Sequence, residues 1–137
     1  MAAMSDYLKS ALLNHIFRNT AFIQPATIAV ALCTAAPVDS DTGATIPEVV
    51  GGGYARKEIA RADANWTLST HSVDNTALTA FPAATGNWGT VTHIALLDNT
   101  IIGAGNILFH GPIDAPKIVG VGNTFEFNAT QLVVQLD

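Results

Sequence analysis

Charged residues are scarce in this chain. Asp, Glu, Lys and Arg together make up 12% of its 137 residues, against about 25% in an average soluble domain. The surface must therefore be built mostly from Thr, Asn, Ser, Gly and Ala. Because the centres of protein interfaces are depleted in charged residues, this composition indicates an obligate assembly in which neighbouring subunits cover much of the surface. A monomer with a neutral surface is the alternative.

Basic residues are scarcer than acidic residues. Six Lys and Arg stand against eleven Asp and Glu, and the net charge is −5. A protein that binds nucleic acid needs several basic groups to displace counterions from phosphates. No nucleic-acid partner is expected.

The chain also lacks cysteine pairs and long apolar runs. Its one cysteine, Cys33, excludes an intrachain disulfide and lies in an apolar run where a buried, inert thiol is usual. No run approaches the roughly 20 apolar residues of a membrane span, and Asp6, Lys9 and His15 interrupt the region where a secretory signal needs an apolar core. We expect no membrane partner and synthesis in the cytoplasm, with Met4 as an alternative start after a short upstream extension.

The first strong pattern is a helix over residues 5–19. Ser5 is a suitable N-cap and Asp6 suits the positive end of the helix dipole. Apolar side chains at helical spacing form a wide face that must pack on the protein's own sheet or on a neighbour. His15 lies on this face without a second ligand at i±4, so a packed histidine is favoured over a metal ligand. The face consists of Leu8, Ala11, Leu12, His15 and Ile16, widened by Leu13 and Phe17.

After Pro25 the hydrophobic period changes to two, which predicts a strand over residues 27–33. Its second face of Ala29, Ala31 and Cys33 is small enough to be covered closely by the helix or by another subunit. Shorter alternating runs follow, separated by turn residues at "HSVDN", "PAATGN", "DNT", "GPIDAP" and "GVGN". The runs are Tyr54–Ala60, Trp66–Leu68, Thr76–Phe81, Val91–Leu97, Asn106–His110, Lys117–Val119, Thr124–Phe127 and Leu132–Leu136.

Strands at this spacing without intervening helices predict a mainly β fold, an antiparallel β-sandwich or jelly-roll-like domain with one N-terminal α-helix. No repeat or linker divides the chain, so a single domain over residues 1–137 is expected, with residues 1–20 as an N-terminal helical arm. Residues 34–53 form a long loop, and loops of this length tend to be functional or to order on a partner.

Two motifs in and after this loop have alternative interpretations. "DSDTG" resembles the start of an EF-hand, but the glycine comes one place early and position twelve is Val50 rather than Glu, which leaves a weak surface calcium site as the alternative. "GGGYARKE" fits no phosphate-binding fingerprint, so its glycines are interpreted as a hinge into the strand that begins at Tyr54.

Candidate chemistry is sparse. Of the four histidines only His93 and His110 lie on strands that can be neighbours, which would allow a shared metal site. The favoured interpretation makes His93 a packed residue on the face of Val91, Ala95 and Leu97. Neither a partnered nucleophile nor a recognisable acid/base pair is found, so no catalytic residue, metal or cofactor is predicted.

Large aromatic side chains allow a further alternative. Trp66, Trp88, Tyr54 and Phe81 would form a sugar-binding platform if their rings were exposed and coplanar. Packing in a core or an interface is favoured, because large aromatics dominate both kinds of burial.

Several segments match a known family in order. "MSDYLKSALLNHIFRNTAF", "QPATIAVALCTAAP", "GGGYAR", "FPAATGNWGTVTHIALLD", "GNILFHG" and the "GNTFEF…LVVQLD" ending resemble a family of small tailed-phage virion proteins. Its members are often labelled tail fibre proteins, and some are similar to head-decoration or cement proteins. The resemblance covers nearly the whole chain.

The resemblance implies a non-enzymatic structural protein of the virion, assembled in the host cytoplasm. A fibre usually needs repeats, a coiled coil or an extended shaft, and this compact chain has none, so a capsid decoration protein that stabilises the head shell is favoured. A tail-fibre or glycan-binding receptor module is the alternative, and a sugar-processing enzyme is set aside. The implied partners are the major capsid protein, or tail proteins, and further copies of the chain, with a trimer expected.

This interpretation assigns contact and packing roles to particular residues. The arm and the long loop would clamp neighbouring subunits, and three aromatic side chains are expected to pack in the core or an interface. The contact residues would be Tyr7, Leu8, Leu12, Ile16, Phe17 and Tyr54, and the packing aromatics Trp66, Trp88 and Phe109.

Overall fold

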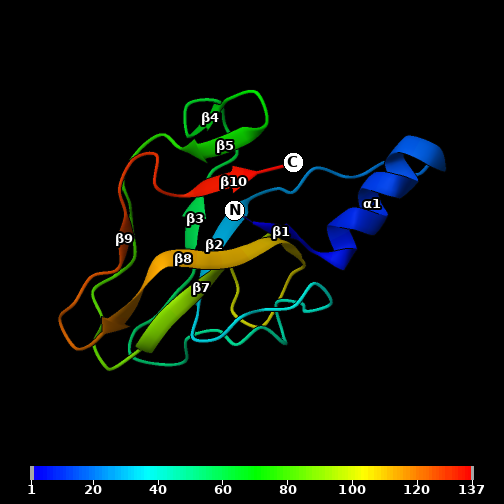
Figure 1. The fold of residues 1–137 in the computed structure, drawn as a ribbon. Coiled ribbons are helices and arrows are strands. Elements are labelled where there is room, and N and C mark those ends of the chain that lie inside the picture. The colour runs from blue at the N-terminus through cyan, green and yellow to red at the C-terminus, as the bar shows by residue number, and fades with distance from the viewer. Residues whose placement is uncertain (1, 137) are drawn as a thin grey trace.

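A computed structural model describes residues 2–136. It confirms the mainly β fold class with antiparallel sheets and one N-terminal helix (Figure 1). The elements are β1 (Ala3–Met4), α1 (Asp6–Phe17), β2 (Ile28–Cys33), β3 (Lys57–Ile59), β4 (Trp66–Leu68), β5 (Ser72–Asn75), β6 (Thr79–Ala80), β7 (Gly89–Leu97), β8 (Ile107–Val119), β9 (Glu126–Phe127) and β10 (Val133–Gln135).

Three antiparallel sheets make up the body. The largest has the strand order β1-β8-β7-β2-β3, and the smaller ones are β10-β5-β4 and β6-β9. The two smaller sheets lie over one face of the large sheet, and residues from all three form one apolar cluster. This layering is the sandwich that the alternating strands predict.

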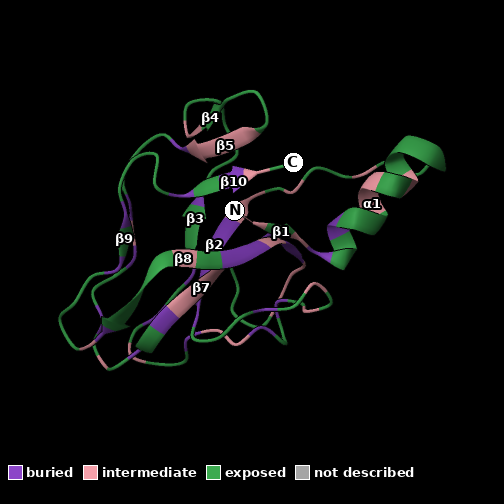
Figure 2. Cartoon of the chain, in the orientation of Figure 1, coloured by how far each residue is buried: buried purple, intermediate pink, exposed green. Residues whose placement is uncertain are grey.

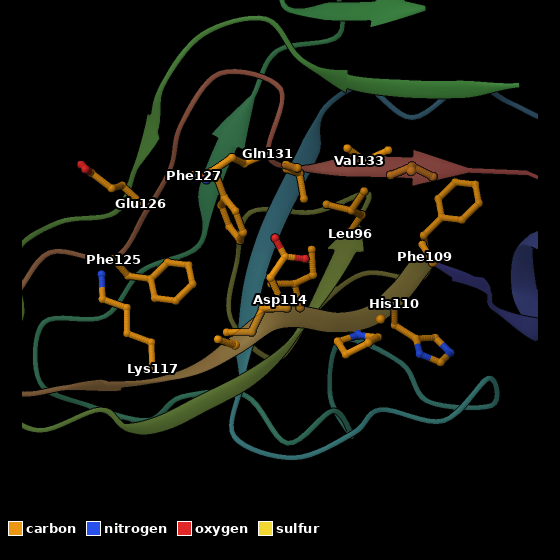
Figure 3. Close-up of a pocket in the computed structure, with 18 of the residues that line it drawn as sticks. Leu96, Phe109, His110, Asp114, Lys117, Phe125, Glu126, Phe127, Gln131 and Val133 are labelled. Carbon is orange, nitrogen blue, oxygen red and sulfur yellow. The ribbon is translucent and has the colours of Figure 1, made fainter. Parts of the chain in front are cut away.

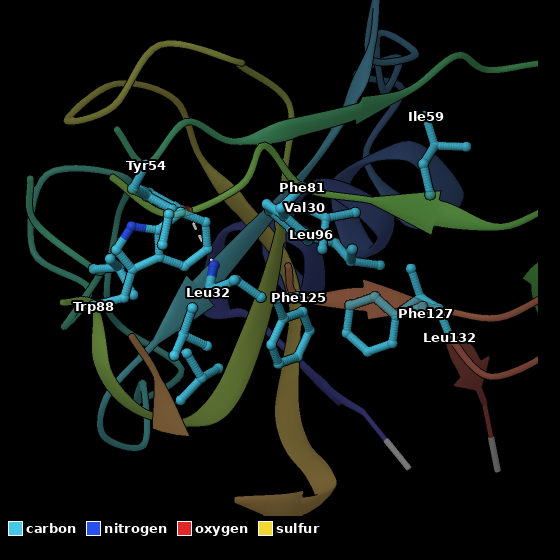
Figure 4. Close-up of a cluster of buried hydrophobic side chains, with 14 of the residues drawn as sticks. Val30, Leu32, Tyr54, Ile59, Phe81, Trp88, Leu96, Phe125, Phe127 and Leu132 are labelled. Carbon is cyan, nitrogen blue, oxygen red and sulfur yellow. Dashed lines mark hydrogen bonds between the residues drawn. The ribbon is translucent and has the colours of Figure 1, made fainter. Parts of the chain in front are cut away.

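The aromatic rings in this cluster pack against one another in stacked and edge-to-face pairs and are not exposed (Figure 4). The ring of Tyr54 lies 6.3 Å from that of Phe81 and 5.4 Å from that of Trp88, and all three residues are buried. Edge-to-face and offset pairs of this kind are the preferred aromatic geometries. The alternative of an exposed, coplanar sugar platform is therefore wrong for these three rings.

The opposite face of β2 packs on the long loop. Ala29, Ala31 and Cys33 form a second cluster with Ile46, which comes from residues 34–53, and with Leu97 of β7. The expectation that the helix or another subunit covers this face is wrong. The side chains on this face are short, so a loop lying flat on the sheet fills the space.

The segment "GPIDAP" is part of a strand, although its prolines and glycine predict a break. It lies inside β8, whose register with β7 shifts so that Thr92 alone lies opposite residues 113–116. Proline is tolerated in this outer strand because β1 pairs with it only at Phe109 and His110. The same shift separates Val91, in the first cluster, from Leu97, in the second, so they do not share the face expected for them.

A second predicted break, "HSVDN", also contains a strand, β5. Its residue Asn75 is buried, and its amide nitrogen donates to the carbonyls of Ala77 and Asn128 at 2.8 and 3.0 Å. Its amide oxygen accepts from the N–H of Leu132 at 2.9 Å. The polar side chain joins distant segments here instead of forming a turn, which local composition does not reveal.

Candidate assembly interface

The helix α1 is held firmly at its base. Ser5 is buried, its N–H donates to the carbonyl of Leu108 at 3.0 Å and its hydroxyl donates to that of Ile107. The same hydroxyl oxygen accepts from the N–H of Leu8 at 3.1 Å, which makes Ser5 the N-cap that the sequence predicts. Leu8 is the buried residue of the helix. One short side chain therefore both starts the helix and ties it to β8.

A charged cluster adds a second tie between the helix, the long loop and β8. The backbone N–H of Asp6 donates to the carbonyl of Asp39 at 2.8 Å, and the ammonium of Lys9 pairs with the Asp39 carboxylate. His110 Nε2 lies 2.7 Å from the other carboxylate oxygen. These hydrogen bonds, from Lys9 first and then His110, lower the pKa of Asp39.

Beyond its base the helix leaves the body, and its outer turns are mostly exposed (Figures 1 and 2). Leu13, Ile16 and Phe17 lie on one face at i, i+3 and i+4 spacing and are 57%, 66% and 76% exposed. These three residues are called the arm patch below. A 12-residue helix is marginal in water without tertiary packing, and no other described part of the chain covers the arm patch.

The sandwich is incompletely closed on one side, where a groove of about 450 Å³ runs between β8 and the C-terminal segment (Figure 3). Its floor includes Ile94, Phe109 and Ile113, which are only partly buried against the core. Asp114 also lines the groove and is exposed (Figure 3). Within the described part of the chain, no residue of α1 lines this groove.

The loop between β2 and β3 is held by a buried arginine that sequence reasoning missed. Arg56 donates from Nε and Nη2 to the two carboxylate oxygens of Glu48, each at 2.8 Å. Its Nη1 donates to the carbonyls of Asn99 and Ala104 at 2.9 and 2.8 Å, and its Nη2 to that of Gly43 at 3.1 Å. The strand alternation around Arg56 carries no signal for this burial, which depends on two loops, residues 34–53 and the β7–β8 connection.

Tyr54 joins the same network. Its hydroxyl donates to Glu48 Oε1 at 2.7 Å and accepts from the N–H of Leu32 at 3.0 Å. Burial, followed by the nearby Glu48 carboxylate, raises the pKa of Tyr54. Because β3 pairs with β2 only from Ile28 to Val30, Tyr54 replaces the missing strand as a partner for Leu32. The long loop is thus a fixed layer of the structure.

The predicted contact residues fall into two groups. Leu8 and Tyr54 are buried within the chain, whereas Tyr7, Ile16 and Phe17 are exposed on the helix and Leu12 is half-buried. Their role in contacts with another subunit stays a prediction.

The three predicted packing aromatics lie in separate places. Trp88 is buried, with its indole N–H donating to the carbonyl of Gly52 at 2.8 Å. Phe109 is half-buried and lines the groove. Trp66 is half-buried in β4, and its indole N–H has no hydrogen-bond partner among the described residues.

The histidines and the cysteine do not combine into a site. Across residues 2–136, no group of three His, Cys, Asp or Glu side chains has the geometry to hold a metal ion. His93 Nδ1 lies 2.8 Å from the hydroxyl of Thr92, and His110 is bound to Asp39. Burial raises the pKa of the Cys33 thiol to about 12. No helix in the described part of the chain is long and apolar enough to cross a membrane.

An antiparallel β-sandwich with one projecting N-terminal helix defines this chain as a mainly β protein. The family comparison gives the particular case: residues 3–135 match the model of the podophage GP4 fiber I protein gp80 family, and the chain belongs to that family. It is a phage virion structural protein, as the resemblance implied. A search of curated proteins finds no match to the chain.

Proposed function

We propose that this protein is a subunit of a fibre on the phage virion and that the arm patch attaches it to its neighbours. The observation that carries the proposal is the exposure of Leu13, Ile16 and Phe17 on a helix that is tied to the sheet and the long loop at its base. Side chains of this size favour burial by about 1.5–3 kcal/mol each. The family's description as a fibre protein supports the fibre over other parts of the virion.

The protein would act in the fibre by non-covalent binding to its neighbours. The aromatic rings of the core are packed against one another and the described residues present no metal-binding cluster. A receptor-binding role through stacked sugars has no support from Tyr54, Phe81 or Trp88, since these residues are buried. The fibre subunit would act as a rigid building block.

Capsid decoration is a second candidate, and one observation favours it. The chain forms a compact sandwich, and its one described helix has 12 residues, so the chain by itself provides no shaft. A decoration protein binds only the assembled shell and adds its binding free energy to the stability of that shell. Its partner would be the major capsid protein, whereas a fibre subunit would contact tail proteins.

Counting molecules separates the two candidates. Quantitative peptide mass spectrometry of purified virions gives the number of copies of this chain relative to the major capsid protein. A fibre subunit is expected at a small fraction of that number, and a ratio approaching one to one would overturn the fibre proposal in favour of decoration.

The attachment role is tested in the same virions. Ile16→Ser and Phe17→Ser, combined in one chain, are expected to reduce its copies per virion by more than tenfold, because interface anchors carry most of the binding free energy. Leu68→Ser is the matched control, since Leu68 is equally exposed on β4, away from the helix. Normal incorporation of the double variant would exclude the arm patch as the attachment surface.

A further inference from the structure

The arm patch and the groove are two separate surfaces of the same chain, the first apolar and the second lined by both apolar and polar side chains. The helix starts beside the groove, because β1 pairs with Phe109 and His110, which line it, and Ser5 then ties the helix to the carbonyls of β8. From there α1 extends away from the sheets (Figure 1). With its base held in this way, the arm patch does not reach the groove of its own chain.

The apolar part of the groove lining is complementary to the arm patch, and the polar part includes Asp114, Lys117 and Glu126. The arm patch offers large apolar side chains, and the groove floor offers partly buried ones, including Ile94, Phe109 and Ile113. A volume of about 450 Å³ lies within the range of pockets that bury most of a ligand's surface. A short amphipathic helix laid into an apolar groove is a recurring mode of recognition.

The charges at the ends of the two surfaces are also complementary. Arg18 directly follows the helix and is exposed, and its side chain makes no hydrogen bond or ion pair among the described residues. Asp114, which lines the groove, is likewise exposed and unpaired among the described residues. In a chain with only six Lys and Arg, an unpaired arginine beside the arm patch and an unpaired carboxylate beside the groove favour a contact between copies.

We propose that the arm patch of one copy binds in the groove of a second copy, with Arg18 paired to the second copy's Asp114. The contact joins two different surfaces and is therefore head-to-tail in kind, so repeated contacts close a ring or extend a filament. This inference rests on the proposed fibre function: the chain is compact, so a fibre built from it gains its length from contacts between copies.

The test measures self-association of the purified full-length protein by analytical ultracentrifugation at concentrations up to about 100 μM, where a Kd of micromolar order leaves mostly oligomer. Phe17→Ser is expected to weaken association about thirtyfold or more, the loss typical of a central aromatic anchor. Leu68→Ser is the matched exposed control and is expected to leave association unchanged.

A charge-reversal cycle identifies the groove as the binding surface. Arg18→Glu and Asp114→Arg are each expected to weaken association by about tenfold or more, and the double variant is expected to restore it, because the pair then carries exchanged charges. Both residues are exposed, so neither change threatens folding. Lys57 is another exposed cation that forms no ion pair within residues 2–136, and Lys57→Glu controls for the change in net charge.

Three results would overturn the inference. They are a wild-type protein that stays monomeric throughout, an association that Phe17→Ser leaves intact, and a charge cycle in which the double variant is no better than the singles. A monomeric protein whose arm variants still fail to enter virions would show that the arm binds a different virion protein, which removes this inference and leaves the proposed function standing.

Discussion

The guanidinium of Arg56 and the carboxylate of Glu48 form a two-bond ion pair inside the protein, with both N···O distances at 2.8 Å and almost no side-chain exposure. The pair joins the end of the long loop to the approach to β3, and Arg56 continues to the carbonyls of Asn99 and Ala104. The long loop and the β7–β8 loop are thus held by one planar donor group, a geometry that lysine does not reproduce.

Neutralising Glu48 tests how much this pair supports the fold. Glu48→Gln is expected to lower the free energy of unfolding by about 3–5 kcal/mol, because it leaves the Arg56 charge buried without a counter-charge. Urea denaturation monitored by tryptophan fluorescence measures the loss. Asp63→Asn, at an exposed position, is the matched control and is expected to change the free energy by less than about 0.5 kcal/mol. Equal stabilities of the two variants would contradict the account.

Alkaline pH should destabilise the protein through two buried groups that resist losing a proton, the Cys33 thiol and the Tyr54 hydroxyl. Burial raises the pKa of Cys33 from 9.0 to about 12 and also raises that of Tyr54 from 10.0. Each group keeps its proton in the folded state and releases it near the ordinary value when unfolded, so the unfolded state gains stability as pH rises above about 9. The stability associated with these groups is fully present below that pH.

The expected slope above pH 9 is about 1.4 kcal/mol per pH unit for one group. Urea denaturation at pH 7, 9 and 10 measures it. Cys33→Ala is expected to flatten the slope between pH 9 and 10, where the ordinary Tyr54 value has not yet been passed. Stability that is independent of pH up to 10, or a slope unaffected by this substitution, would be the opposite result.

The cap at Ser5 should control the order of the helix. Ser5→Ala removes the acceptor for the Leu8 N–H and the donor to the Ile107 carbonyl, a loss of about 1–2 kcal/mol. Amide hydrogen exchange in α1 is expected to accelerate about 5- to 30-fold.

Ser10→Ala provides the comparison for this cap. Ser10 lies on the exposed side of the same helix, where alanine has the higher helix propensity. Exchange in α1 should therefore stay constant or slow. Equal acceleration by the two substitutions would show that the cap does not anchor the helix.

Two glycines between β7 and β8 differ in a way that only their surroundings explain. Gly103 and Gly105 have positive φ values of 85° and 90°, so alanine costs each about 1–2 kcal/mol in backbone strain. A Cβ at Gly105 would also lie 2.5 Å from Asn99 Cβ and 2.8 Å from an Asp98 carboxylate oxygen, whereas one at Gly103 meets open space.

Gly105→Ala is therefore expected to be less stable than Gly103→Ala by about 1–3 kcal/mol, the usual cost of overpacking. Thermal unfolding of the two variants checks the difference. Equal melting temperatures would mean that the loop moves aside without cost.

Local sequence patterns were sufficient to predict the helix and several strands, or parts of them. The alternation of Ile28, Val30 and Leu32 predicted β2, and the run from Val91 to Leu97 predicted most of β7. Ser5 and Asp6 marked the start of α1 correctly. Each of these signals is short in range: a side-chain period or a cap needs only neighbouring residues.

The missed features depend on contacts between distant residues. Asn75 is a turn former by composition, yet it is buried and bonded to Asn128 and Leu132, more than fifty residues away. Arg56 follows an ordinary strand pattern but is buried because Glu48 and three backbone carbonyls converge on it.

The sequence by itself determined the class of this protein. Its alternating apolar residues and capped N-terminal helix define a mainly β fold with one helix, and its ordered segments resemble a phage virion family. Only the tertiary structure decided which surface is left uncovered. Leu8 and Phe17 are both apolar residues of one helix, but the first is held against β8 and the second projects into solvent. Burial depends on where a helix is anchored, and that anchor joins residues about a hundred positions apart.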